Sequence, residues 1–273
     1  MRLKITHTTD YVYDEPMPYA LQRLRLTPQT GSSQTVEDWD VSVDGATVEV
    51  TYDDHFGNRV ALVETEGPQK RVKVVATGTV STQDKAGVFG YHIGSAPLWL
   101  FLRETPRTKP GKLVRELVKV SAGESELARL HNLMETIHGK VEYVPGATDI
   151  ETTAEAALEA GKGVCQDHAH ILISAARQMG LPARYVSGYL MMDEVEEQTA
   201  THAWAEVHLQ GLGWVGFDAA NNICPDDRYV RIASGLCYRD CAPISGMRIG
   251  PAGETLSVSV TVQQSQSQSQ SQS

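Results

Sequence analysis

The sequence predicts an α+β protein in which an antiparallel β-sandwich is followed by a domain of helices packed on an antiparallel sheet. Three observations carry this prediction. Short runs with an apolar residue at every second position extend to about residue 82. From Pro97 the apolar spacing becomes that of helices, and strand-like runs return after Gly180. Strands, then helices, then strands again are typical of an α+β chain.

The opening region reads as half-buried antiparallel strands. Its alternating runs are separated by turn formers such as Asp44-Gly45 and the segment Phe56-Gly57-Asn58. The alternating runs cover residues 2–7, 40–43, 47–52 and 71–76. Several short strands of this kind favour a β-sandwich.

Helical stripes follow in the middle of the chain. Apolar residues recur at helical spacing over 113–120 and 127–137, and a short helix is expected over 152–159, with Gly161 just past its end. A longer helix is expected from Val164 to Met179, stopped by Gly180-Leu-Pro182. This last helix should pack into the core.

The end of the chain returns to strands, expected at 184–190, 201–209, 214–218 and 255–262. We therefore divide the chain into a sandwich domain at 1–90, a second domain at 91–262 and a tail at 263–273. The tail is a Ser-Gln repeat with nothing to bury, so we expect it to be disordered.

Charge and composition exclude several classes of protein. The net charge of -10 disfavours nucleic acid and anionic membranes as partners. No apolar run approaches the roughly 20 residues of a membrane-spanning helix, and the start lacks the apolar stretch of a secretory signal. We therefore expect a cytoplasmic protein. Four cysteines in 273 residues are too sparse for a disulfide framework.

The segment from Gly161 to His170 delivers one cysteine, Cys165, to the first turn of the long helix. The unpaired amides and dipole at a helix N-terminus favour a thiolate, and the amide of Cys165 could donate to an oxyanion. Gly163 lets a backbone or a substrate approach closely. These are the requirements of a cysteine nucleophile.

A base and an orienting group are expected in the next strands. A tight turn at 210–212 would set Trp204 opposite Asp218 in a hairpin. His202 and Asp218 would then be diagonal neighbours on one face, with Cβ atoms roughly 7–8 Å apart. One residue of slip would separate them, so the register is an assumption at this point. The geometry permits a triad of Cys165, His202 and Asp218.

Four motifs in this order resemble the bacterial transglutaminase-like family, a branch of the papain-like cysteine enzymes. They are Gly-Val-Cys-Gln-Asp-His-Ala-His at 163–170, Gly-Leu-Pro-Ala-Arg-Tyr-Val-Ser-Gly-Tyr at 180–189, Thr-His-Ala-Trp at 201–204 and Gly-Trp-Val-Gly-Phe-Asp at 213–218. The resemblance extends to the opening β region, which looks like the family's N-terminal domain, and to the closing strands.

The resemblance implies a transglutaminase-like fold and acyl transfer through a thioester on Cys165. Two departures put substrate preference and the pocket floor in doubt. Relatives usually have Pro-Thr where Ala219-Ala220 stands, and a histidine where Tyr229 stands.

Other residues have open roles. Gln166 and Tyr143 are further oxyanion donors to consider, and Trp204, on the face of His202, could border the cleft. His168 and His170 lie two apart on one helix and cannot chelate one metal together, so we assign no metal site. Cys224, Cys237 and Cys241 lack a fourth ligand and read as ordinary thiols.

We expect no cofactor and a peptide or protein substrate. Hydrolysis is favoured over crosslinking because no calcium-loop pattern appears and water is the default acceptor. Three rivals remain: another thiol acyltransferase of the same fold, a metal-dependent hydrolase using His168 or His170 with Asp167, and a non-catalytic binding module. The natural substrate and the oligomeric state are not readable from the sequence.

Overall fold

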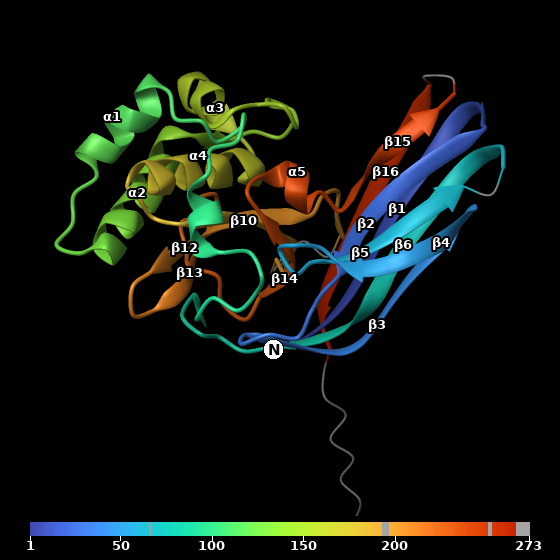
Figure 1. The fold of residues 1–273 in the computed structure, drawn as a ribbon, viewed down its shortest axis with the longest axis horizontal. Coiled ribbons are helices and arrows are strands. Elements are labelled where there is room, and N and C mark those ends of the chain that lie inside the picture. Colours follow the sequence, from blue (N-terminus) through green and yellow to red (C-terminus); the bar gives the residue numbers. More distant parts are fainter. Residues whose placement is uncertain (66, 193–196, 251–252, 266–273) are drawn as a thin grey trace, which may run out of the picture.

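The computed structural model of the chain describes residues 1–65, 67–192, 197–250 and 253–265. A β-sandwich stands beside a third sheet, helices α1 to α4 gather over one face of that third sheet, and the short helix α5 lies between the third sheet and the sandwich (Figure 1). The expected α+β fold class is confirmed. The helices α1 to α4 fall where apolar spacing placed them.

The sandwich is built from both ends of the chain. Its larger sheet runs, in spatial order, β11 (Glu197–Gln198), β16 (Glu254–Gln264), β1 (Arg2–Met17), β6 (Gln69–Thr82) and β3 (Gln34–Asp44). Its smaller sheet runs β15 (Ile244–Ile249), β2 (Tyr19–Thr27), β5 (Arg59–Thr65) and β4 (Ala46–Asp53). Every pairing within these two sheets is antiparallel.

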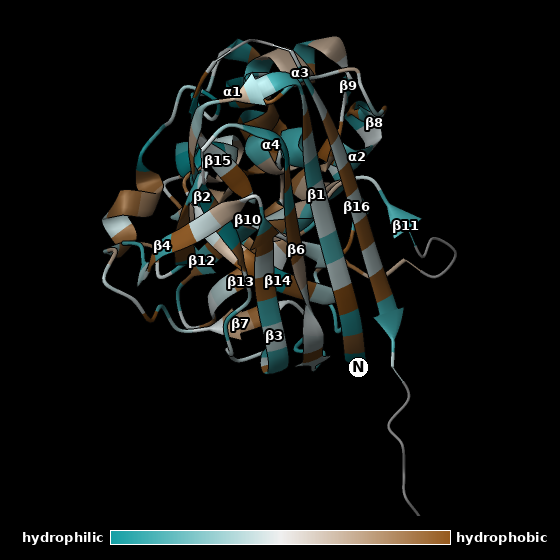
Figure 2. Cartoon of the chain, turned by 90° about the vertical axis from the view of Figure 1, so that its right-hand side faces the viewer, coloured by the Kyte–Doolittle hydropathy of each residue, from teal (hydrophilic) through white to brown (hydrophobic). Residues whose placement is uncertain are grey.

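The alternating pattern gives the larger sheet two buried faces. Apolar and polar bands alternate along β1 and β16 (Figure 2). Val74 and Ala76 face the smaller sheet with Leu24, whereas Leu3 and Ile5 pack with Tyr189 of the third sheet. Because side chains alternate across a strand, one sheet serves as the wall of two cores.

The third sheet carries the candidate site and runs β14 (Tyr229–Gly235), β10 (Ala183–Leu190), β12 (His202–Leu209), β13 (Gly213–Phe217) and β7 (Val88–Gly90). The helical elements are η1 (Leu98–Leu102), α1 (Lys112–Val120), α2 (Glu126–Lys140), α3 (Ala154–Ala160), α4 (Cys165–Gln178) and α5 (Tyr238–Cys241). A short parallel pair, β8 (Glu142–Tyr143) and β9 (Lys162–Gly163), lies beside the start of α4.

Helix α4 is the centre of the second core. It is buried along its length and packs on the face of β12 that carries Ala203, Ala205 and Val207. Small side chains on that face let the helix approach the sheet closely. The opposite face of β12 carries His202, Trp204, Glu206 and His208, as strand alternation requires.

The strand pairing differs from the expected division at residues 90 and 262. Strand β7 hydrogen-bonds to β13 in the third sheet, while β15 and β16 join the sandwich rather than the second domain. An alternating pattern identifies a strand but not its partner, so the sequence alone does not assign these segments to a sheet. β14, which the sequence reading did not predict, forms an edge of the third sheet.

The tail differs in part from its expected disorder. Gln263 and Gln264 extend β16, where they pair with Lys4 and Leu3. Residues 266–273 lie outside the described residues. Among the described helices, none is both long and apolar enough to span a bilayer.

Two buried histidines predict acid sensitivity. His7, on sandwich strand β1 beside the Tyr189 hydroxyl, has its pKa lowered to about 4 by burial, and burial lowers the pKa of His170 in α4 to about 3. In the unfolded chain both histidines take up a proton near pH 6.5, so the unfolded state binds more protons below that pH. The contribution of these two neutral histidines to the free energy of unfolding is therefore complete above about pH 6.5 and is lost as the pH falls toward 4. His7 alone accounts for about 3 kcal/mol of this loss.

Urea unfolding at pH 7 and pH 4 measures the effect. His7→Gln should lose part of the pH dependence, because the residue that gains a proton on unfolding is gone. The raised pKa of His202 contributes with the opposite sign but is common to both proteins, so their difference isolates His7. Equal pH dependence in the two proteins would contradict the prediction.

Candidate active site

Cys165 is the first residue of α4 and is 8% exposed. Gly161 ends α3 in the left-handed conformation (φ 62°), and the chain then pairs with β8 before entering α4. The Asp167 carboxylate accepts from the Val164 amide at 2.8 Å and so fixes the entry to the helix. The positive end of the helix dipole therefore lies at the Cys165 sulfur.

His202 and Asp218 meet as the hairpin predicts. Ala205 pairs with Phe217 and Leu209 with Gly213, the register that sets Trp204 opposite Asp218. Nε2 of His202 lies 2.6 Å from Oδ2 of Asp218, and both side chains are buried. The bond to Asp218 occupies Nε2 and leaves Nδ1 of the imidazole for Cys165.

The electrostatics favour a charged imidazole. Burial opposes the charge, but the Asp218 carboxylate and the neighbouring Cys165 side chain together raise the pKa of His202. Burial likewise opposes the charge on Asp218, but His202 and the other hydrogen-bond donors around the carboxylate lower its pKa. The pocket thus supports an imidazolium next to a carboxylate, and an imidazolium stabilises a thiolate on Cys165.

Asp218 is held by more than His202. Its Oδ1 accepts from the amides of Ala220 and Asn221 at 3.0 and 3.3 Å. Its Oδ2 accepts from Asn221 Nδ2 and from the Tyr229 hydroxyl, each at 2.7 Å. Five donors around one carboxylate fix its orientation and keep it ionised.

Tyr229 replaces the histidine expected of the family, and the structure gives it a definite place. It lies on β14, is 5% exposed, and sets its ring edge-on to His202 and to Trp204. Sequence reasoning marked this position only as a departure. The sequence gives no sign that β14 pairs with β10, and this pairing is what brings residue 229 beside residue 218.

Of the oxyanion candidates, Tyr143 is near the nucleophile. Burial first, and then its contacts with the charge and thiol of Cys165, raise the pKa of Tyr143 to about 12, so its hydroxyl is a neutral donor at pH 7. The Cys165 amide also faces this hydroxyl. Gln166 instead donates to the carbonyl of Asp149 at 3.3 Å. The amide of Cys165 and the hydroxyl of Tyr143 therefore lie close together, and Gln166 is engaged elsewhere.

The two pocket candidates, Gly163 and Trp204, pack against other residues of the site. Gly163 is buried, and a Cβ there would lie 2.7 Å from the Cβ of Asp167. The bare glycine therefore makes room for the helix-capping aspartate rather than for a substrate. Trp204 is 1% exposed and stacks on His202 at 6.3 Å between ring centroids, so it backs the imidazole from the core.

The alternative metal ligands have other partners. Both ring nitrogens of His168 lie about 3 Å from backbone carbonyls, of Val164 and Val141, and His170 accepts from the Tyr238 amide. Across the described residues, no group of three or more His, Cys, Asp or Glu side chains is placed to hold a metal ion. All four cysteines are free.

Two family models match this chain. Residues 112–219 match the model of the transglutaminase-like superfamily, and residues 3–81 match that of the bacterial transglutaminase-like N-terminal region. This is a transglutaminase-like protein. The matched core contains Cys165, His202 and Asp218, which the two strands and α4 bring together.

Two relatives of this transglutaminase-like protein match nine-tenths or more of its length. An uncharacterised protein of Mycobacterium leprae (strain TN) is 29% identical, over 94% of this chain and 96% of its own. An uncharacterised protein of Mycobacterium tuberculosis (strain H37Rv) is also 29% identical, over 90% of this chain and 87% of its own. A Cytophaga hutchinsonii protein described as a "putative cysteine protease" has the same fold. Its TM-score is 0.77 at 23% identity, over 97% of this chain and 92% of that one.

Tyr229→Phe is expected to disturb the site without emptying it. The buried Asp218 carboxylate loses one donor, which costs about 1.5–3 kcal/mol of stability at neutral pH. The same loss raises the pKa of Asp218, so the acidic limb of the pH profile for Cys165 alkylation should move to higher pH. Tyr189→Phe is the matched control, because it removes a buried hydroxyl that contacts His7 and not the triad. Identical pH profiles for Tyr229→Phe and the unaltered protein would show that the hydroxyl does not position Asp218.

Proposed function

We propose that this protein is a cysteine enzyme that cleaves amide or peptide bonds through Cys165, His202 and Asp218. The observation that carries the proposal is the 2.6 Å contact between His202 Nε2 and Asp218 Oδ2, with Cys165 at the N-terminus of α4 beside the same imidazole. A buried imidazole held by a carboxylate next to a thiol is the arrangement of an activated nucleophile.

In the proposed reaction the Cys165 thiolate attacks the carbonyl carbon of the scissile amide. The Cys165 amide and the Tyr143 hydroxyl donate to the oxyanion that develops. The C–N bond then breaks, and the His202 imidazolium gives its proton to the departing nitrogen. A thioester is left on Cys165, and His202, now neutral, takes a proton from the water that hydrolyses it, which restores the imidazolium. Asp218 keeps the imidazole oriented throughout.

Water is the proposed acceptor, and a peptide or protein the proposed substrate. The protonated Tyr143 can serve either hydrolysis or transfer to an amine, because both pass through the same oxyanion. Hydrolysis and transfer to an amine are therefore distinguished by their products. We also propose that the enzyme works in the cytoplasm, in keeping with its free thiols.

Mapping of iodoacetamide labelling by mass spectrometry near pH 6 tests the nucleophile. At that pH an ordinary thiol of pKa about 8.5 is almost wholly protonated and reacts slowly. Burial raises the pKa values of Cys224 and Cys241 further, which makes them internal controls. We expect Cys165 to label at least about tenfold faster than either. If Cys165 labels no faster than Cys224, the nucleophile assignment is wrong.

A peptide library incubated with and without a primary amine separates the reaction classes. Hydrolysis gives shortened peptides, or glutamine converted to glutamate, in both incubations, whereas transfer gives amine-substituted products only when the amine is present. Treatment with a chelator is the control for the rival metal-dependent hydrolase, which should lose activity while surviving iodoacetamide. No turnover by either route, with an unreactive Cys165, would leave the non-catalytic binding module.

A further inference from the structure

A second candidate site lies away from the triad, between the sandwich and the third sheet. Loops at 29–34 and 56–58 and the segment 89–93 enclose it with side chains from β10, β13 and β14. Its volume is about 340 Å³, and none of Cys165, His202 and Asp218 lines it. We call this space the interdomain cavity.

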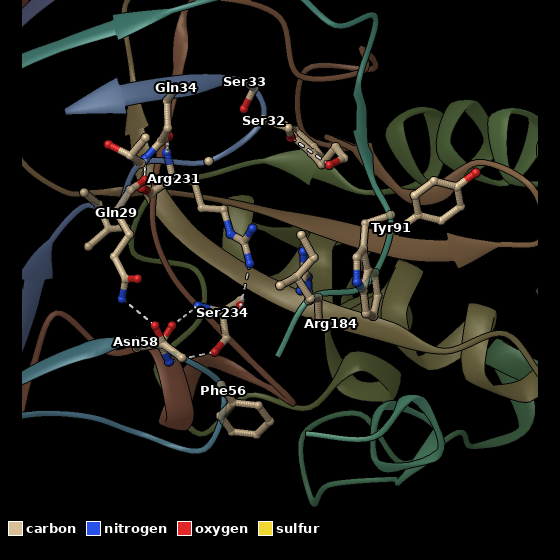
Figure 3. A pocket seen from close by; sticks show the side chains of 17 residues that line it. Gln29, Ser32, Ser33, Gln34, Phe56, Asn58, Tyr91, Arg184, Arg231 and Ser234 are labelled. Carbon is tan, nitrogen blue, oxygen red and sulfur yellow. Dashed lines mark hydrogen bonds between the residues drawn. The ribbon is translucent and has the colours of Figure 1, made fainter. Parts of the chain in front are cut away.

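The charged side chains that line the interdomain cavity are Arg184 and Arg231, and all of its lining residues are described. Figure 3 shows both arginine side chains directed into the space, with Tyr91 and Phe56 at its sides. In a chain of net charge -10, a cavity whose charged lining is wholly cationic is the reverse of the average surface. Such a cavity attracts anions.

One buried carboxylate balances the two arginines only in part. Glu206 is fully buried beneath the cavity, and its Oε2 accepts from Nε and Nη2 of Arg184 at 2.6 and 2.5 Å. The Arg184 guanidinium also stacks on Trp214, 3.9 Å from the ring centre. Arg231 is farther from Glu206: its Nε lies 4.0 Å from Oε1. Glu206 therefore forms its close ion pair with Arg184, and Arg231 adds a further positive charge to the cavity lining.

The Arg231 guanidinium has more N–H donors than its hydrogen bond to Ser234 uses. Its Nη2 donates to the Ser234 hydroxyl at 2.9 Å, and the side chain is 31% exposed. Burial and then repulsion by Arg231 lower the pKa of Arg184 to about 10, so an added negative charge would relieve both guanidiniums. The planar fork of a guanidinium suits the paired oxygens of a carboxylate or a phosphate.

We propose that the interdomain cavity binds a small anion carrying a carboxylate or phosphate group, held by the free edge of Arg231 beside Arg184. The aromatic walls at Trp214, Phe56 and Tyr91 suit an apolar body attached to that group. The ligand would touch both the sandwich loops and the third sheet, and so would hold the two parts together. This binding does not depend on the proposed catalysis.

Calorimetric titration of the full chain with inorganic phosphate and, separately, with succinate tests the proposal and distinguishes the two anions. We expect one equivalent of at least one of them to bind. Arg231→Gln should weaken that binding about tenfold or more, the loss expected for a charge-assisted hydrogen-bonded pair. Arg23→Gln, an exposed position on β2, removes the same charge elsewhere and should change the affinity less than about twofold.

A conservative variant at the same position distinguishes a loss of anion binding from a loss of the fold. Arg231→Lys keeps the charge but loses the planar fork, and it should bind more weakly than the unaltered protein and more tightly than Arg231→Gln. Circular dichroism checks that each variant is folded. The proposal fails if neither anion binds, or if Arg23→Gln weakens binding as much as Arg231→Gln does. The Cys165→Ala protein should bind as the unaltered protein does, so a failed catalytic hypothesis leaves this result unaffected.

Discussion

His202→Gln is expected to abolish thioester formation, with a loss of turnover of about 10⁴-fold or more. Glutamine can still accept or donate a hydrogen bond, but it cannot take the Cys165 proton or pass one to the departing nitrogen. The imidazolium that stabilises the thiolate is also lost, so rapid iodoacetamide labelling of Cys165 near pH 6 should disappear with the activity.

His208→Gln is the matched control for this prediction. His208 lies on the same strand and face, but it packs against Trp214 and is far less buried than His202. Its replacement should leave both the labelling rate and the turnover close to those of the unaltered protein. Full turnover by His202→Gln would rule the triad out.

Glu206→Leu is expected to lower the free energy of unfolding by about 3–5 kcal/mol, the largest stability effect that we predict. The substitution leaves the Arg184 guanidinium, 6% exposed, without its carboxylate in the core. An unpaired buried charge costs far more than the pair itself contributes. Urea unfolding at pH 7, followed by fluorescence, measures the change.

The double variant Arg184→Met with Glu206→Leu tests the cause. Removing both charges replaces the pair by apolar side chains of similar length, so most of the lost stability should return. If the double variant is as unstable as Glu206→Leu alone, packing around Glu206 rather than the orphaned charge accounts for the loss. The comparison forms a thermodynamic cycle between two residues in contact.

The candidate triad could be predicted from the sequence because its signals are local. Glycines around residue 161 and the apolar stripe of 164–179 place Cys165 at a helix start, whatever that helix packs against. The turn at 210–212 fixes the hairpin register, and the register alone brings His202 and Asp218 onto one face. Both signals operate over fewer than 20 residues, where turn chemistry and side-chain alternation decide geometry.

Only the tertiary structure decided which strands share a sheet and which residues surround the triad. The alternation in 254–264 requires a strand with a buried face, but many partners would satisfy it, and β1 at the other end of the chain is the one used. Tyr229 and Arg231 owe their neighbours to the same kind of pairing, between β14 and β10. Long-range pairing depends on which apolar faces can bury one another together, a property of the whole chain rather than of any segment.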